Sequence, residues 1–508
     1  MIALKRRGIS HATYLNACVI LGLLAVAVIT RASRIGDPAI HIDEQFYLLV
    51  ADRMWHGALP YVDIWDRKPI LLFLIYAALR PLSPDGIVAY QLGALLFATA
   101  TAFMIFLIAQ RFANLIGSCL AGVAYLLYLP VLSGVGGQSP VFYNLFMAIG
   151  AWEIIRAGEA RDPAAVWRLG LRSMLWVGLA IQVKYTAAVE GAAFGLWLIV
   201  LLTRHKSAPT HIAACAAVWA AAALTPTLVA AGFYVLIGHG QEFWHANFIS
   251  IFQKHEPDGF SSIGILRVSA AKLAALLPVM IPSIALLMRR QTMTASRPFL
   301  LLWMAFAVAE FFAIGNYYDH YALPLLVPAM LICAPALGTA IGGATGTALF
   351  MLFFVWATGF PAVDWRTFDE SRISAMVEAA RPYAARGCIY LNDGPMIVYL
   401  LTRSCLPTRY VFPSHLNDLA EASSTDATHN MAALLASRPS AIFVADRPRF
   451  PPRNLVTAAM LDASLARDYQ LVATMPDVYS ERQQILYVRN DLLPQRETQR
   501  SPDHLQSN

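Results

Sequence analysis

The amino-acid sequence predicts a polytopic α-helical membrane protein with a small α/β domain at its C-terminal end. Of its 508 residues, 58% are hydrophobic and only 14% are charged, whereas soluble domains carry about 25% charged residues. Apolar stretches long enough to cross a hydrocarbon core of roughly 30 Å recur until about residue 361. We therefore expect a transmembrane domain at 1–361, an α/β domain at 362–493 and a disordered polar tail at 494–508.

The apolar stretches predict about eleven transmembrane helices. Single spans are expected near 13–30, 88–110, 114–132, 140–157, 210–237, 264–288, 298–315, 319–337 and 341–361. The run from Leu169 to Leu202 would be roughly 50 Å long as one helix. It would also bury Lys184 in lipid at a cost of about 3 kcal/mol. Two spans that turn near Lys184 remove both problems.

The basic residues predict the orientation of the chain. Lys and Arg cluster in the loops that are cytoplasmic if the N-terminus is inside, and this topology makes the α/β domain periplasmic. Such scattered clusters form no basic domain, so the formal net charge of +6 does not indicate a nucleic-acid partner. The exception is the first outer loop (31–87), whose basic residues include Arg31, Arg34, Arg53, Arg67 and Lys68. A charge rule that fails in one loop indicates a function there.

The C-terminal part alternates between short strands and short helices. Strands are expected at 388–391, 441–445, 470–473 and 484–488, and helices at 396–402, 431–436 and 455–466. Cys388 and Cys405 are the only cysteines of this part. Because the predicted topology places them on the oxidising side of the membrane, we expect a disulfide between them, with two separately buried thiols as the alternative.

The first outer loop is expected to contain two short helices. In the segment 44–56 the large apolar residues share one helical face, which predicts a helix lying in the membrane interface. The run 70–79 would be about 15 Å long as a helix, too short to span, and predicts a second interfacial or re-entrant helix. Asp43 and Glu44 stand at the start of the first helix. They either cap it or act chemically.

The residue types of this loop suit a reaction at the membrane surface. A carboxylate can take a proton from a hydroxyl nucleophile. Cations such as Arg67 and Lys68 can hold a phosphate leaving group. A substrate with a polar head and a lipid tail presents its reactive bond at this height. The alternative is that the acids cap a helix and the cations anchor lipid headgroups.

Several motifs of the loop occur in a fixed order. They are Asp43-Glu44, Tyr47, Gly57-x-x-Pro60-Tyr61-x-Asp63 and Trp65-Asp66-x-Lys68-Pro69. This order resembles the first periplasmic loop of GT-C superfamily membrane glycosyltransferases, in particular bacterial relatives of protein O-mannosyltransferases and of the lipid A aminoarabinose transferase. The stretches 320–328 and 405–410 resemble further parts of that family.

The resemblance implies an inverting glycosyltransferase of the bacterial inner membrane. Such an enzyme moves a sugar from a polyprenyl-phosphate donor to a hydroxyl acceptor at the periplasmic face, and the acceptor is a glycan, a lipid or a protein. By the motif match Asp43 takes the place of the general base and Glu44 that of its companion. Lys68 takes the place of a donor-phosphate ligand, and Tyr47 falls where some members contact that phosphate.

The sequence departs from the family pattern in two places. Phe46 stands where some relatives have an arginine. The second outer loop has Gln138 and Asn144 but no acid where many members carry one. Since the spacing of the acids matches no metal-ligand rule, we expect no metal site and no cofactor other than the lipid-linked donor, with a divalent metal as the alternative.

Further polar residues near the outer ends of the spans are secondary candidates. Arg67 and Lys254 are expected to add to donor-phosphate binding, with a solvated charge run as the alternative for Lys254. Asp66, Asp319 and His320 are expected to orient the site, with helix capping as the alternative for the last two.

A transporter or flippase of a lipid-linked or small polar substrate is the second function class. Transporters place their polar residues near the membrane midplane on broken helices, whereas the unusual residues of this chain gather at one surface. The distribution favours the enzyme. Glu310, about one turn from the outer end of its span, is an intramembrane carboxylate, which indicates function by default, although its side chain can also snorkel.

Overall fold

The computed structural model describes residues 11–254, 263–274, 277, 280–281, 283–284, 296–314, 318–361, 364–449 and 452–493. It divides into two compact units, Met1–Ser371 and Arg372–Asn508, which are described separately. The boundary falls within α17 (Trp365–Ala384). The tail 494–508 and much of the expected span 264–288 lie outside the described residues.

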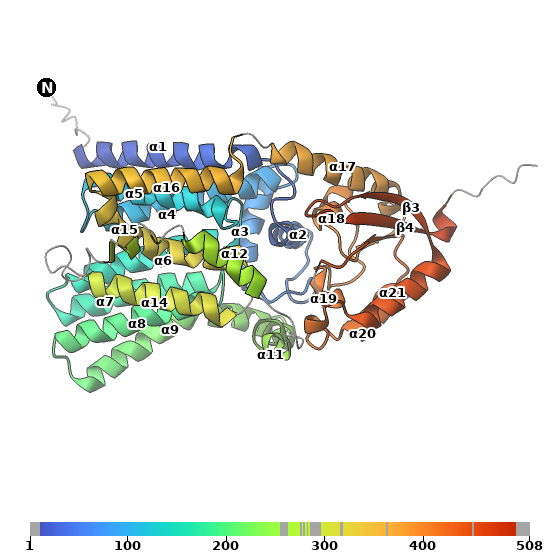
Figure 1. Cartoon of the computed structure of the whole chain (residues 1–508). Helices are drawn as coiled ribbons and strands as arrows, with labels where there is room; N and C mark the ends of the chain where they lie inside the picture. The colour runs from blue at the N-terminus through green and yellow to red at the C-terminus, as the bar shows by residue number, and fades with distance from the viewer. Residues whose placement is uncertain are drawn as a thin grey trace, which may run out of the picture. The chain divides into compact units, whose positions relative to one another are not determined.

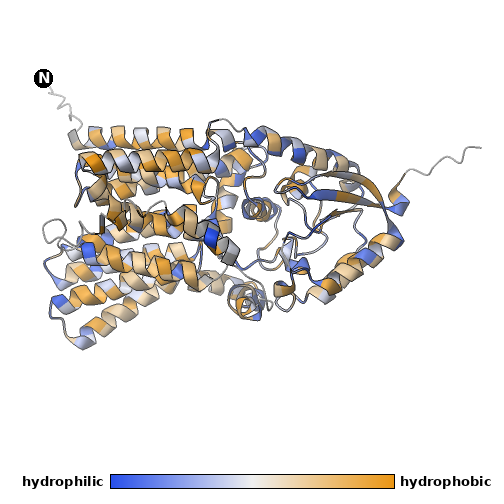
Figure 2. Ribbon diagram, viewed as in Figure 1, coloured by the Kyte–Doolittle hydropathy of each residue, from blue (hydrophilic) through white to orange (hydrophobic). Residues whose placement is uncertain are grey.

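The first unit is a bundle of helices (Figure 1). Its long helices are α1 (His11–Arg31), α4 (Ile87–Ala109), α5 (Leu115–Val131), α6 (Ser139–Gly158), α7 (Pro163–Ile181), α8 (Ala187–Arg204), α9 (Pro209–Leu236), α12 (Ile263–Ala274), α14 (Arg297–Ile314), α15 (Leu326–Leu337) and α16 (Ala340–Thr358). Figure 2 shows hydrophobic residues along most of their length. Each of these helices overlaps a predicted span.

Seven helical stretches among the described residues are long and apolar enough to cross a membrane by length and composition alone. About eleven spans are expected; of the others, α5 is shorter than this limit, and much of 264–288 lies outside the described residues. The run 169–202 does form two helices, since α7 ends at Ile181 and α8 begins at Ala187. Lys184 lies in the turn between them, as predicted.

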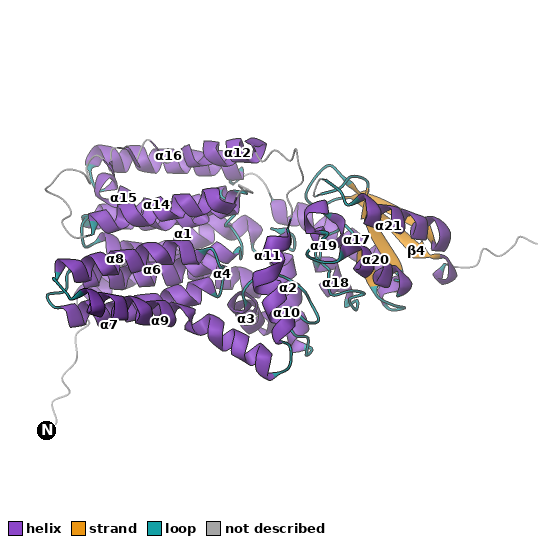
Figure 3. Cartoon of the chain, turned by 90° about the horizontal axis from the view of Figure 1, so that it is seen from below, coloured by secondary structure: helices purple, strands orange, loops and turns teal. Residues whose placement is uncertain are grey.

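Small residues allow the helices of the bundle to approach closely. Helices α1, α4, α5, α15 and α16 pack against one another, α6 to α9 and α14 form a second group, and α4 and α6 join the two groups (Figures 1 and 3). A Cβ on Gly117 of α5 would lie 2.2 Å from the carbonyl oxygen of Ala334 on α15. A Cβ on Gly178 of α7 would lie 2.6 Å from that of Ala223 on α9. Glycine is therefore needed where these backbones meet.

Short helices of the outer loops lie at one end of the bundle (Figures 1 and 3). They are α2 (Ile42–Trp55), α3 (Ile70–Leu79), α10 (Gly240–Trp244), a π-helical turn at His245–Ile249 and α11 (Ser250–Gln253). Both helices predicted in the first outer loop are present. Helix α2 differs from the prediction in being buried on all faces from Glu44 to Asp52, and only its last turn, with Trp55, is exposed. The reason is that α3 covers it, with Phe46 and Tyr47 of α2 both packed against Phe73 of α3.

The second unit contains the predicted small α/β domain. Its strands are β1 (Ile389–Leu391), β2 (Ala441–Ala445), β3 (Tyr469–Pro476) and β4 (Gln483–Arg489), and its helices are α18 (Ile397–Thr402), α19 (Ser414–Asn417), α20 (Ala427–Ala436) and α21 (Leu455–Asp468). The strand order is β1-β2-β4-β3, with β1 parallel to β2 and the other pairs antiparallel. The predicted disulfide is confirmed, since Cys388 and Cys405 are bonded with their Cα atoms 4.8 Å apart.

Candidate functional site

Asp43 lies in the first turn of α2, beside two histidines. The Nδ1 atom of His41 accepts the backbone N–H of Asp43 at 3.2 Å. That bond requires an unprotonated Nδ1, so the 3.8 Å separation between this nitrogen and Asp43 Oδ2 is not an ion pair. Nε2 of His320 lies 4.0 Å from the same oxygen. The two imidazole rings meet edge to face at 5.3 Å, so both flank the carboxylate.

Lys68 lies in a turn that neighbouring residues hold in place. Its backbone N–H donates to Asp66 Oδ1 at 2.7 Å, and its carbonyl oxygen accepts the hydroxyl of Tyr61 at 2.8 Å. Burial alone would lower the pKa of Lys68, but nearby acidic groups, Asp43 first among them, outweigh this effect and its pKa is raised. Lys68 therefore carries a positive charge next to Asp43 at neutral pH.

Arg67 points toward another loop helix. Its Nε donates to Ser250 Oγ at 3.0 Å, and its guanidinium lies 5.0 Å from the centre of the Trp65 ring. These contacts join the first outer loop to α11. Burial raises the pKa of Asp66, although Lys68 and Arg67 oppose this effect. Asp66 thus holds the backbone of Lys68, while its role in orienting the site and phosphate binding by Arg67 both stay predictions.

Tyr47 lies one helical turn after Asp43, and its side chain is buried. Its ring meets those of Phe73 and Tyr76 edge to face, at 6.2 Å and 5.5 Å. Burial raises the pKa of the Tyr47 phenol well above its usual value, and the charge of Asp43 adds to this effect. The hydroxyl makes no hydrogen bond to any described residue. It therefore stays protonated and can donate to a bound group.

Glu44 faces different surroundings from Asp43. The Glu44 side chain is fully buried, and a Cβ on Gly136 would lie only 2.1 Å from its Oε2 atom. Burial raises the pKa of Glu44 to about 8, although the N–H of Gly137 and the hydroxyl of Tyr90 lie near enough to lower it. Neither donor reaches ordinary hydrogen-bond geometry. Glu44 is therefore mostly protonated at neutral pH and joins the first outer loop to the second.

The structure brings three further residues to Asp43 that the sequence reasoning did not select for the site. Besides His41, these are Tyr321, whose ring contacts that of His320 at 4.5 Å, and Lys184. The ammonium of Lys184 lies 4.6 Å from the centre of the Tyr321 ring. The available signals were an N-cap position for His41, a place in the 320–328 motif for Tyr321, and a lysine within an apolar run for Lys184.

Two other candidates have less defined surroundings. Asp319 opens the 3₁₀ helix η4 (Asp319–Leu325) and is half-buried. Lys254 follows α11 and is also half-buried, and residues 255–262 after it are outside the described residues. The roles of both stay predictions. Within the described part of the chain, no group of three or more His, Cys, Asp or Glu side chains is arranged to hold a metal ion.

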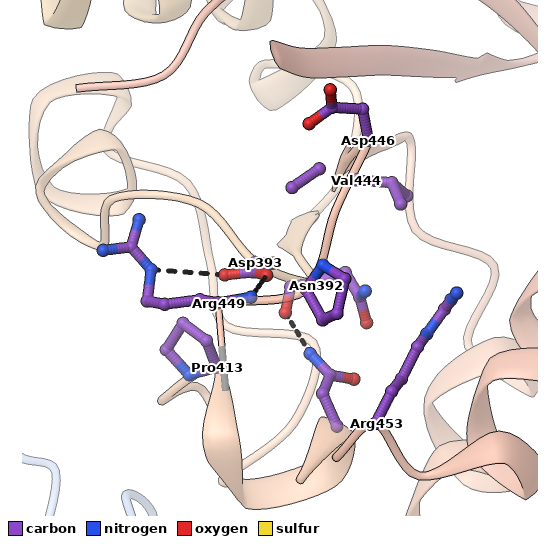
Figure 4. Close-up of a pocket in the computed structure, with 10 residues that line it drawn as sticks. Asn392, Asp393, Pro413, Val444, Asp446, Arg449 and Arg453 are labelled. Atoms are coloured by element: carbon purple, nitrogen blue, oxygen red, sulfur yellow. Dashed lines mark hydrogen bonds and ion pairs between the residues drawn. The ribbon is translucent and has the colours of Figure 1, made fainter. Parts of the chain in front are cut away.

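A small cavity in the second unit lies at the carboxyl ends of β1 and β2 (Figure 4). Its volume is about 30 Å³, which is the space of a single water molecule. Arg449 closes one side, where its backbone N–H donates to Asp393 Oδ2 at 2.7 Å and its Nε to Oδ1 at 3.3 Å. Arg482 and Asp477 extend this network, with Arg482 Nη2 3.0 Å from Asp477 Oδ2. The cavity is too small for a sugar, and the network stabilises the domain.

Comparison with solved structures identifies the architecture. ArnT from Cupriavidus metallidurans, bound to undecaprenyl phosphate, matches with a TM-score of 0.60 and 15% identity over 95% of this chain and 99% of ArnT. Its apo state matches with a TM-score of 0.61 at 15% identity, over 96% and 100% of the two chains. The apo oligosaccharyltransferase from Archaeoglobus fulgidus matches with a TM-score of 0.50 and 10% identity over 85% of this chain and 70% of its own.

The chain has the GT-C fold. The resemblance drawn from the loop motifs is thereby confirmed at the level of architecture, as is the polytopic helical class with a C-terminal α/β domain. No protein-family model matches the sequence. No curated protein matches it either. Within this GT-C fold, the described side chains around Asp43 and Lys68 form the candidate site.

Proposed function

We propose that this GT-C protein is an inverting glycosyltransferase that moves a sugar from a polyprenyl-phosphate donor to a hydroxyl acceptor. The observation that carries the proposal is that the Lys68 ammonium stays charged because it lies in the field of the Asp43 carboxylate. The fold supports it, because ArnT has the same architecture and binds undecaprenyl phosphate. The proposal places the site on the periplasmic face of the bacterial inner membrane, with the N-terminus in the cytoplasm.

The chemistry is a single displacement. The acceptor oxygen forms a bond to the anomeric carbon while the bond from that carbon to the phosphate oxygen breaks. Asp43 accepts the proton of the acceptor hydroxyl, and polyprenyl phosphate leaves with the electron pair. Attack from the face opposite the phosphate inverts the anomeric configuration.

Each of the neighbouring side chains has a defined part in this proposal. Lys68 binds the phosphate and stabilises the negative charge that grows on it as the bond breaks. The protonated Tyr47 hydroxyl, which has no described hydrogen-bond partner, donates to the same phosphate. His41 holds the first turn of α2 by accepting the backbone N–H of Asp43, and His320 lies beside the Asp43 carboxylate. Glu44 acts as the companion of Asp43 by fixing the start of α2 against the second outer loop.

The test is sugar transfer by the purified, reconstituted protein. Undecaprenyl-phosphate sugars labelled in the glycosyl group are supplied with a cell-envelope extract that provides glycan, lipid and protein acceptors. The proposal predicts label in an acceptor and release of undecaprenyl phosphate, both absent with Asp43→Asn. Mass spectrometry of envelope glycans from cells with and without the protein identifies the acceptor.

The competing transporter hypothesis makes a different prediction for the same preparation. A transporter would move the intact lipid-linked sugar between the two leaflets of the vesicle and release no undecaprenyl phosphate. Accumulation of intact donor in the opposite leaflet, with no transfer to any acceptor, would therefore reject the proposed enzyme.

A further inference from the structure

A second cluster of buried polar side chains lies beside Asp43 and Lys68, and the proposed chemistry does not use it. It consists of Lys184 in the turn between α7 and α8, Tyr143 near the start of α6, Glu310 near the end of α14 and Glu190 near the start of α8. Each of these side chains is almost fully buried. The cluster therefore joins three chain segments that are far apart in the sequence: the start of α6, the α7–α8 turn with the start of α8, and the end of α14.

The members of this cluster lie close to one another but form no hydrogen bonds with one another. Glu310 is the charged group that acts most strongly on Lys184, and it also faces Tyr143. Nevertheless, Lys184 Nζ, the Tyr143 hydroxyl and both carboxylate oxygens of Glu310 make no hydrogen bond to any described residue. In Glu190, Oε2 accepts Trp303 Nε1 at 2.5 Å, while Oε1 has no described donor.

Unsatisfied polar groups at this depth indicate a ligand. A buried polar atom without a partner costs about 1–3 kcal/mol, and more if it is charged. The cluster offers ammonium donors, carboxylate acceptors and a hydroxyl that does both. A structural ion pair would instead have closed into direct contact, as Arg482 and Asp477 do in the second unit. Mixed donors and acceptors match the hydroxyl groups of a sugar, because each hydroxyl can accept and donate.

The cluster also lies where the transferred sugar must be. The charge of Lys184 acts on both Lys68 and Asp43, and its ammonium lies over the Tyr321 ring at 4.6 Å. The ring of Tyr321 in turn contacts His320, which is next to Asp43. The polar cluster is therefore continuous with the pair of residues that would hold the phosphate and activate the acceptor.

We propose that Lys184, Glu310 and Tyr143 form the subsite that binds the glycosyl group of the donor. Lys184 donates to one ring hydroxyl, Glu310 accepts from another, and Tyr143 bridges the two. Since the cluster contains two carboxyl groups, Glu310 and Glu190, and one ammonium, Lys184, the subsite selects a sugar with free hydroxyls and no acidic group. This inference rests on the proposed function, because it assumes that a glycosylated polyprenyl phosphate is the substrate.

The test compares binding of undecaprenyl phosphate with and without a sugar. Native mass spectrometry titrations of the purified full chain use undecaprenyl phosphate and its mannosyl, galactosyl, 4-aminoarabinosyl and glucuronosyl derivatives. We expect the wild type to prefer at least one non-acidic derivative over the bare lipid, and not the glucuronosyl one. Lys184→Met and the nearly isosteric Glu310→Gln should each lose this preference about 10-fold or more, as expected for a hydrogen bond with a charged group. Both should still bind the bare lipid like the wild type.

The bare lipid also serves as the folding control for each variant. Lys206→Met, an exposed lysine in the turn after α8, is the matched control and should leave all affinities unchanged. If Lys184→Met weakens bare and glycosylated lipid equally, Lys184 is a phosphate ligand and the subsite is overturned while the proposed function stands. Preference for the glucuronosyl lipid, or for none of the sugars, also overturns it. If the wild type binds none of these lipids, the proposed function fails as well.

Discussion

The Asp43 carboxylate lies 4.0 Å from Nε2 of His320, although the two residues come from opposite ends of the first unit's sequence. This contact places the first turn of α2 against η4, so the acid in the first turn of the loop helix and the motif 320–328 belong to one site. Changes in either segment should therefore affect the same reaction step.

Asp43→Asn should abolish sugar transfer while the protein stays folded and inserted. Asparagine keeps the size and the capping ability of aspartate but cannot accept the proton, so turnover should fall at least about 100-fold. Single-turnover transfer measured with a saturating donor checks this. Asp162→Asn is the matched control, because Asp162 caps α7 through the N–H of Ala165 and asparagine caps equally well. Near-normal turnover of Asp43→Asn would mean that another group is the base.

Lys68→Ala should weaken use of the donor more than use of the acceptor. Loss of a charge-assisted hydrogen bond to phosphate corresponds to about 1.5–3 kcal/mol, or roughly 10- to 100-fold in donor affinity. The pKa of Lys68 is raised, and pH 9 is about 1.5 units below even the ordinary lysine pKa. Donor binding by the wild type should therefore not weaken as the pH rises from 6 to 9. Measured dependence on donor and acceptor concentration decides the assignment, and an effect on the acceptor alone would reject it.

Glu44→Gln should remove a pH dependence of stability. The pKa of Glu44 is raised by burial from 4.5 to about 8, so between these values the unfolded chain loses a proton that the folded chain keeps. The free energy of unfolding of the wild type is therefore highest below about pH 4.5. It falls as the pH rises toward 8, by up to about 1.4 kcal/mol per pH unit. The amide of Glu44→Gln does not titrate, so the free energy of unfolding of the variant does not fall in this way. Thermal unfolding of both proteins from pH 5 to 9 should show melting temperatures that diverge with rising pH, with the variant higher at pH 8, and parallel curves would contradict the assignment.

Gly136→Ala should destabilise the first unit. The added methyl carbon would lie 2.1 Å from Glu44 Oε2, and relief of that overlap should cost about 1–3 kcal/mol. Gly232→Ala is a suitable control, because it lies in α9 with no atom within 4 Å of the added carbon. The control should leave the melting temperature unchanged or raise it slightly. Equal melting temperatures for the wild type and Gly136→Ala would show that α2 moves freely away from the second loop.

Replacing Cys388 and Cys405 together by serine should destabilise the second unit. The bond closes a loop with a sequence separation of 17 residues, and loss of that restraint on the unfolded chain should cost on the order of 3 kcal/mol. Thiol labelling provides the direct measurement. The denatured, unreduced wild type should label at Cys18, Cys119, Cys215 and Cys333 alone, and prior reduction should expose two more sites. Labelling of all six without reduction would contradict the bond.

Local pattern was sufficient to predict most of the elements. Helix α3 and strand β2 have the bounds expected from their apolar runs, because length and flanking residues determine such short segments. The different surroundings of Asp43 and Glu44 could not be predicted, since neighbouring residues on a helix point about 100° apart and the contact for Glu44 comes from Gly136 in another loop. The pairing of Lys184 with Tyr321 likewise depends on how distant helix ends meet.

The contact between Glu44 and Gly136 has a consequence for engineering the protein. The two outer loops are complementary in shape at this point, since Glu44 fits only where the second loop has no side chain. A chimera that imports segment 31–87 from another protein with the GT-C fold would bring a helix whose shape fits a different second loop. Loop exchange aimed at new acceptors should therefore transplant 31–87 and 132–138 together as one cassette.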